Sequence, residues 1–315
     1  MATYSVEPIR ENLHGTFSRE FPPILTIEPG DTVVYRTLDA AWNIEPRNSA
    51  VPEDRPRKLE PRDPERDAGH CLDGPVAIRG AEPGMTLEVR VEEIKVGTWG
   101  WTVAGGWKSP ENVRLSVDEA PEFMHLWALD QATLTGRNQN GHVVKLRSFM
   151  GVMGMPPNEA GSHPTAPPRV MGGNMDCKEI IAGTTLYLPI AVEEGLFSVG
   201  DGHALQGDGE VSTTAIECPM DRVVLRFDLR TDLPIKTPRL HTPEAWMTLG
   251  FNEDLDEASF LALDEMLSLM RDQHSLEYQE ALALASLLVD LRVTQMVNGV
   301  RGVHAVLRHD ALRTV

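Results

Sequence analysis

Apolar and polar residues alternate along many short segments between residues 1 and 240. In the segment 86–94, Leu87, Val89 and Val91 alternate with charged residues. A period of two predicts strands that bury one face. By this pattern we expect strands at 24–27, 32–37, 76–78, 86–94, 143–149, 184–190, 195–199, 211–217 and 222–229. Short strands separated by frequent Gly and Pro turns favour a β-sandwich or barrel over a doubly wound sheet.

One long segment lacks this alternation of apolar and polar residues. Residues 45–68 are rich in proline and charge and carry few apolar positions. Such a segment cannot bury itself, so we expect a surface loop or lid.

The pattern changes after about residue 240. Thr242, followed by Pro243 and Glu244, has the composition of a helix N-terminus. The spacing of Asp254 and Glu257 fits a capping box and predicts a helix to about residue 270.

A second helix is predicted at 276–290, with Ser275 as its cap, and Asn298-Gly299 then predicts a hairpin turn. We therefore expect a mainly β fold with α/β additions. A β-sandwich-like core would span 1–240, and a helical α/β segment, 241–315, would pack on it as a second unit or as part of one domain.

Composition narrows the function classes. The 315 residues include 29 Lys and Arg against 47 Asp and Glu, a formal charge of −18. That field repels nucleic-acid phosphates and anionic membranes, so neither is an expected partner. Three cysteines without a CxxC pair read as reduced thiols, and no signal peptide or membrane-spanning run is evident. We expect a cytoplasmic protein.

The densest group of reactive side chains lies in 198–217. Glycines interrupt a series of five polar residues, Asp201, His203, Gln206, Asp208 and Glu210. Histidine and carboxylates are common ligands of divalent metals. A flexible loop with solvated carboxylates, or a calcium site, explains the same composition.

Two other segments could contribute. Asn174 and Asp176 follow a Gly-Gly turn, where Asp176 could accept a turn hydrogen bond or bind a metal. His70 precedes another turn, and a lone histidine is more often structural than a ligand.

Taken together, the blocks GHCLDGPVAIRGAEPGMTLEVRVEEI, GGNMDCKEIIAGTTLYLPI and LFSVGDGHALQGDGEVSTTAIE resemble, in order, the signature blocks of the acetamidase/formamidase family. The resemblance continues through TPEAWMTLGFNEDLDEA and LVDLRVTQMVNGVRGVHAVL and covers nearly the whole chain. It implies a β-sandwich-like core, a homodimer or higher homo-oligomer, and hydrolysis of a small aliphatic amide to a carboxylic acid and ammonia.

The resemblance also implies a site. We expect a divalent ion, zinc first, held by His70, Asp176 and His203, with Glu210 as the general base that takes a proton from the attacking water. Asp201 and Asp208 would orient the histidines by accepting hydrogen bonds from them, and Asn174 or Gln206 would hold the substrate amide.

Other catalytic mechanisms fit the sequence less well. The chain has no Gly-x-Ser-x-Gly motif for a serine hydrolase. Cys177, Lys178 and Glu179 offer the parts of a nitrilase-like site, but neighbouring residues on a strand point to opposite faces. The remaining alternative is a non-catalytic β-sandwich that binds a metal or another ligand.

Overall fold

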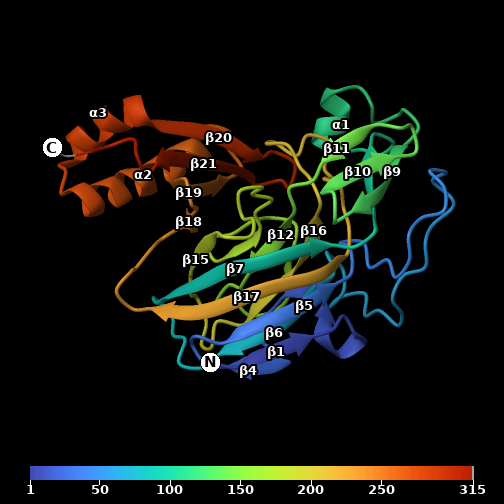
Figure 1. Cartoon of the computed structure of the whole chain (residues 1–315), viewed down its shortest axis with the longest axis horizontal. Coiled ribbons are helices and arrows are strands. Elements are labelled where there is room, and N and C mark those ends of the chain that lie inside the picture. The colour runs from blue at the N-terminus through green and yellow to red at the C-terminus, as the bar shows by residue number, and fades with distance from the viewer. Residues whose placement is uncertain (314–315) are drawn as a thin grey trace.

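The computed structural model describes residues 1–313 and contains one nine-stranded sheet that runs through most of the molecule (Figure 1). In sheet order its strands are β1 (Thr3–Val6), β5 (Thr32–Thr37), β17 (Met220–Arg230), β7 (Thr86–Val96), β15 (Thr185–Pro189), β18 (Arg239–His241), β19 (Ala245–Asn252), β21 (Arg301–Arg308) and β20 (Val289–Gln295).

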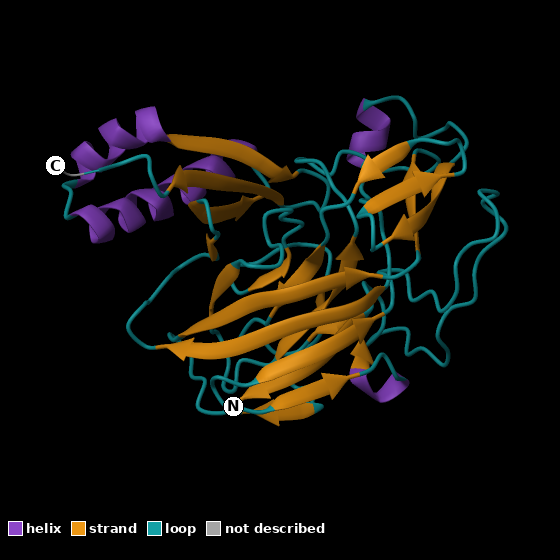
Figure 2. Cartoon of the chain, viewed as in Figure 1, coloured by secondary structure: helices purple, strands orange, loops and turns teal. Residues whose placement is uncertain are grey.

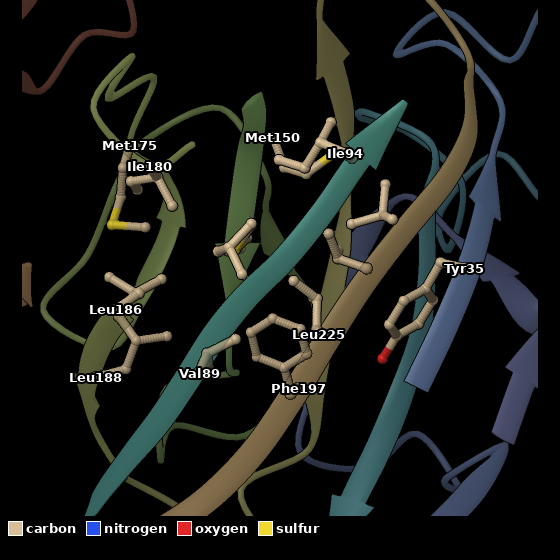
Figure 3. Close-up of a cluster of buried hydrophobic side chains, with 14 of the residues drawn as sticks. Tyr35, Val89, Ile94, Met150, Met175, Ile180, Leu186, Leu188, Phe197 and Leu225 are labelled. Atoms are coloured by element: carbon tan, nitrogen blue, oxygen red, sulfur yellow. The ribbon is translucent and has the colours of Figure 1, made fainter. Parts of the chain in front are cut away.

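A second, six-stranded sheet packs against the first. It comprises β14 (Gly172–Asn174), β12 (Phe149–Gly154), β16 (Phe197–His203), β6 (Leu72–Ile78) and β2 (Leu13–His14), with β4 (Leu25–Ile27) parallel to β6. The rings of Phe197 and Phe227 meet between the sheets with centroids 5.0 Å apart. Val89 and Leu225 from one sheet and Met150 and Phe197 from the other belong to the same buried cluster (Figure 3). The predicted β-sandwich-like core is confirmed.

Smaller elements surround this core. A four-stranded sheet consists of β11 (Val143–Lys145), β10 (Thr135–Asn138), β9 (Phe123–Asp130) and β8 (Trp99–Ala104). The pair β3 (Thr16–Phe17) and β13 (His163–Pro164), the 3-10 turn η1 (Arg10–Asn12) and the short helix α1 (Pro110–Arg114) complete the set. Residues 45–68 form the expected loop between β5 and β6 (Figure 2).

Two helices, α2 (Leu255–His274) and α3 (Tyr278–Leu288), lie together at the C-terminal end of the chain (Figure 2). Asp254 caps α2 as predicted, since its side chain accepts hydrogen bonds from the backbone N–H groups of Asp256 and Glu257. Met266 and Leu307 share a buried cluster that joins these helices to the sheet. None of the described helices is long and apolar enough to cross a membrane.

The boundary predicted near residue 240 stays a prediction. Strands before and after it, β15 and β19, are both hydrogen-bonded to β18, so the main sheet runs through this position. The last residues of the predicted segment 241–315, namely 314–315, lie outside the described residues.

Three local predictions were wrong. Thr242 does not begin a helix: its hydroxyl accepts hydrogen bonds from the N–H groups of Glu244 and Ala245 in a turn that leads into β19. Ser275 ends α2 in the left-handed conformation, with φ of 56°, and α3 begins after Glu277. Residues 211–217 form no strand and contribute only bridges at Glu217.

Candidate active site

Three polar side chains from two separate segments of the chain meet at Gly151 on β12. Asp201 and His203 come from the end of β16, and Asp176 follows β14. A Cβ added at Gly151 would lie 2.4 Å from Asp201 Oδ2, 2.7 Å from Asp176 Oδ1 and 2.8 Å from His203 Cε1. Any side chain here would collide with all three, so the glycine lets them converge.

Hydrogen bonds set the tautomer of the neutral His203 ring. The amide nitrogen of Gln206 donates to the backbone oxygen of Asp176 at 2.8 Å, and a carbonyl oxygen can only accept. The Gln206 Oε1 atom therefore faces His203 Nδ1, at 2.9 Å, and must accept a hydrogen bond from its N–H group. In the neutral ring the free lone pair then lies on Nε2.

The Nε2 atom faces two carboxylates. It lies 3.2 Å from Asp201 Oδ1 and 3.3 Å from Glu217 Oε2. The backbone of Glu217 is held by paired hydrogen bonds with Trp101 at 2.8 and 2.9 Å. His203 Nε2 and Glu217 Oε2 are both buried without a hydrogen-bond partner, as expected for atoms arranged around a common cation.

A second carboxylate pair, Asp176 and Glu210, lies beside His203. The three residues can each direct one ligand atom to within 4.8 Å of the others, as can Asp201, His203 and Glu217. One oxygen of Asp176 and one of Glu210 are buried and unpartnered. The other Asp176 oxygen accepts a hydrogen bond from Asn298 Nδ2 at 2.6 Å.

Four buried carboxylates around one imidazole shift one another's pKa values. Burial raises the pKa of Asp176 to about 6 and that of Glu217 to about 7. Burial, followed by the charge of Asp176, raises the pKa of Glu210 well above its usual value.

The pKa values of His203 and Asp201 shift in the direction opposite to the effect of burial. Burial disfavours the charged ring, but Glu217 and Asp201 outweigh it and raise the pKa of His203. The pKa of Asp201 is lowered, because the positive charges of His203 and His70 overcome its own burial. The cluster thus favours additional positive charge at its centre.

The backbone is strained at the same residues. Asp176, Asp201 and Glu210 have positive φ angles of 47°, 60° and 46°. Non-glycine residues rarely adopt this conformation, and each instance costs on the order of 1–3 kcal/mol. Its recurrence at three clustered carboxylates fits a functional site.

A cavity of about 280 Å³ opens onto the cluster and reaches Asp201, Glu210 and Glu217. His70 and Asn174 also line it. The Asn174 Oδ1 atom is buried and unpartnered, and the amide nitrogen donates to the backbone oxygen of Ala166. Asn174 therefore offers a free acceptor to a small molecule in the cavity.

The structure brings together some of the residues expected from sequence and separates others. Asp176 and His203 are adjacent, whereas His70 is outside both groups of possible ligands and has its Nδ1 atom 2.7 Å from Thr165 Oγ1. Asp208 does not orient a histidine, because its carboxylate accepts hydrogen bonds from Arg292 and lies 3.3 Å from Lys178 Nζ.

Gln206 and Asp201 also differ from their expected roles. The Gln206 amide is bonded to His203 at its oxygen and to the backbone of Asp176 at its nitrogen, so it positions His203, and it does not line the cavity at the cluster. Asp201 lies in front of His203, at the free nitrogen.

Sequence reasoning missed Glu217 and Asn298. Glu217 ends the same polar block, and Asn298 sits in the predicted hairpin turn. This turn reaches the site because Gly209 exchanges backbone hydrogen bonds with Thr294 and Met296 at 2.9 and 3.2 Å.

A thiol mechanism finds no support in this geometry. Cys177 is fully buried, and burial raises its pKa to about 12. A thiol with so high a pKa is a poor nucleophile at neutral pH.

Comparisons with known proteins agree with the resemblance. The profile of the Acetamidase/Formamidase family matches residues 3–160 and 158–298. The formamidase of Methylophilus methylotrophus is 25% identical over 255 residues, covering 64% of this chain and 60% of that protein. The acetamidase of Mycolicibacterium smegmatis is 24% identical over 259 residues, covering 63% of this chain and 61% of that protein.

The chain thus aligns with about 60% of the length of these curated relatives. A solved structure of acetamidase from Yersinia enterocolitica superposes with a TM-score of 0.85 at 26% identity, covering 99% of this chain and 93% of that one. The chain therefore belongs to the acetamidase/formamidase family.

Proposed function

We propose that this protein hydrolyses small aliphatic amides, such as formamide or acetamide, to the carboxylic acid and ammonia, and that it needs a divalent cation to do so. The observation that carries the proposal is the buried cluster in front of His203 Nε2, where carboxylate oxygens lie unpartnered at the wall of a small cavity. Its family membership points to the same reaction.

The donor set fits a cation. Asp201, Glu217 and His203 Nε2 would hold it, because the two carboxylates lie 3.2 and 3.3 Å from Nε2 and Gln206 leaves Nε2 unprotonated in the neutral ring. His70 lines the same cavity and would offer a further ligand. A divalent cation at such a site lowers the pKa of water and polarises a carbonyl oxygen.

The remaining side chains supply proton transfer and orientation. Glu210 would take the proton of the attacking water and deliver it to the leaving nitrogen, since its raised pKa makes its carboxylate a stronger base than that of an ordinary glutamate. Asp176, fixed by Asn298, would hold that proton in common with Glu210. The free oxygen of Asn174 would accept a hydrogen bond from the substrate N–H.

The alternative function is binding without catalysis. A calcium site would use oxygen ligands, and the central position of His203 favours a metal that also accepts nitrogen. Zinc is the ion that we propose first, although manganese, iron and nickel bind similar donor sets. Homo-oligomerisation and a cytoplasmic location also stay predictions, and sedimentation and cell fractionation would test them.

The direct experiment measures ammonia released from formamide, acetamide and propionamide. The purified protein is assayed as isolated, after chelation, and after single metals are restored. We expect turnover that chelation abolishes and one metal recovers. Metal binding without turnover on any of the three amides would favour the binding protein, and turnover that survives complete metal removal would contradict the role of the cation.

A further inference from the structure

A second, larger cavity adjoins the site. Its volume is about 520 Å³, and it shares Ala41 and Trp101 with the wall of the catalytic cavity. One side is formed by the long loop that begins after β5, and the other by β8 and β9. The volume is within the range of small-molecule sites. Formamide or acetamide would leave this adjoining space unfilled.

The second cavity is positively charged, in contrast with the protein as a whole. Its charged lining consists of Arg47, Arg55 and Lys58, opposed by Glu122 alone. The chain has a formal charge of −18, so its overall field repels anions. A local excess of cations is what an anion would need in order to bind here.

The charge of Arg47 is buried and poorly satisfied. Its side chain is only 4% exposed, and its Nε atom has no hydrogen-bond partner. The terminal nitrogens contact the sulfur of Met124 and, at 3.4 Å, the backbone oxygen of Pro52. A thioether is a weak acceptor for a guanidinium, which binds carboxylates best through paired hydrogen bonds.

The structure offers only a partial counterion. Glu122 Oε1 lies 3.8 Å from Arg47, its Oε2 lies 3.7 Å from Arg55, and Oε1 is itself buried without a hydrogen bond. These long contacts help to hold the loop against β9. They leave the Nε atom of Arg47 and the positive charge of Lys58 free for a ligand.

Apart from Asn43, the rest of the wall is largely apolar and includes Trp101, Val103 and Trp107. We propose that this cavity binds the carboxylate of a substrate whose other end is the reactive amide, so that the preferred substrates are monoamides of short aliphatic dicarboxylic acids. The inference rests on the proposed amide hydrolysis and specifies its substrate class. The amide would occupy the catalytic cavity, the methylene chain would pass Trp101, and the carboxylate would meet Arg47.

The test compares charged and uncharged substrates of matched size. Values of kcat/KM are measured for succinamate and glutaramate, and for the corresponding diamides, which replace the carboxylate by a neutral amide. Because a charge-assisted hydrogen bond is roughly twice as strong as a neutral one, we expect the monoamide acids to be preferred by about tenfold or more.

Single substitutions test which side chains cause the preference for the monoamide acids. Arg47→Gln should reduce it towards one, and Arg55→Gln and Lys58→Gln, which change exposed side chains, should each weaken it. Arg222→Gln is the matched control, since this arginine pairs with Glu93 at 2.6 Å on the surface of the main sheet. Equal rates for acid and diamide, or a preference that survives all three variants, would overturn the inference.

Succinate binding, followed by calorimetry, separates this inference from the proposed activity. Acetamide hydrolysis without succinate binding and without a preference for succinamate would refute the carboxylate subsite and leave the activity standing. Succinate binding that Arg47→Gln abolishes, in a protein that hydrolyses no amide, would confirm the subsite and contradict the activity.

Discussion

Replacing Gly151 with alanine tests whether the polar cluster works as one unit. The new Cβ would lie 2.4 Å from Asp201 Oδ2, whereas ordinary contact begins near 3.4 Å, so that carboxylate must withdraw by about 1 Å. Asp176 and His203 must also move, by slightly less. A misplacement of about 1 Å at a catalytic group can cost about 10²-fold in rate. We therefore expect kcat/KM for acetamide to fall by about two orders of magnitude, together with weaker metal binding.

A matched variant separates this effect from general damage. Gly207→Ala adds the same methyl group nearby, but its Cβ meets nothing within 4 Å and the backbone is not left-handed. It should keep near-normal activity, and both variants should fold, as judged by circular dichroism and thermal melting. Full activity and metal affinity in folded Gly151→Ala protein would refute the idea that these three side chains are positioned by contact.

Three further predictions follow from the same cluster. Glu210→Gln should lower kcat by about 10²–10⁴-fold with the metal retained. The control is Glu265→Gln, which changes an equally buried glutamate paired with Arg239 and should leave kcat unchanged. Similar losses of kcat in both variants would contradict a specific role for Glu210. Cys177→Ala should keep most of its activity in the ammonia assay, because burial leaves the thiol protonated; loss of turnover with the metal still bound would revive a thiol mechanism. The chelated protein should melt at lower temperature as pH rises through about 6–7, because Asp176 and Glu217 hold protons more tightly when folded than when unfolded. That stabilisation is complete below about pH 4 and is lost at higher pH. Added metal should flatten the dependence of melting temperature on pH, and Glu217→Gln should reduce it. A pH dependence that neither change affects would contradict the prediction.

Local patterns predicted much of the fold because they depend on neighbours in sequence. The alternation of Leu87, Val89 and Val91 gave a strand that is buried in the sandwich, and Asp254 capped the helix that its spacing indicated. The same local logic failed at Thr242, where a side-chain oxygen likewise accepts hydrogen bonds from the backbone but closes a turn before a strand. A capping residue identifies a chain reversal or helix start but does not choose between them.

The site was harder to predict because its decisive contacts join distant parts of the chain. Asp176 and Asn298 are 122 residues apart in sequence, and Arg292 removes Asp208 from the cluster across 84 residues. Glu217 was overlooked because its role depends on backbone pairing with Trp101, which no spacing within its own segment encodes. Residue types identified the right segment, but only the fold decided which carboxylates face His203.

We propose that a cation binds at His203 Nε2 between Asp201 and Glu217. Anomalous X-ray diffraction from crystals of active protein, recorded on both sides of the metal's absorption edge, tests it most directly. We expect one strong peak about 2.0–2.1 Å from His203 Nε2, if the ion is zinc, and within bonding distance of both carboxylates. A peak elsewhere in the molecule, or active crystals with no metal peak, would contradict the account.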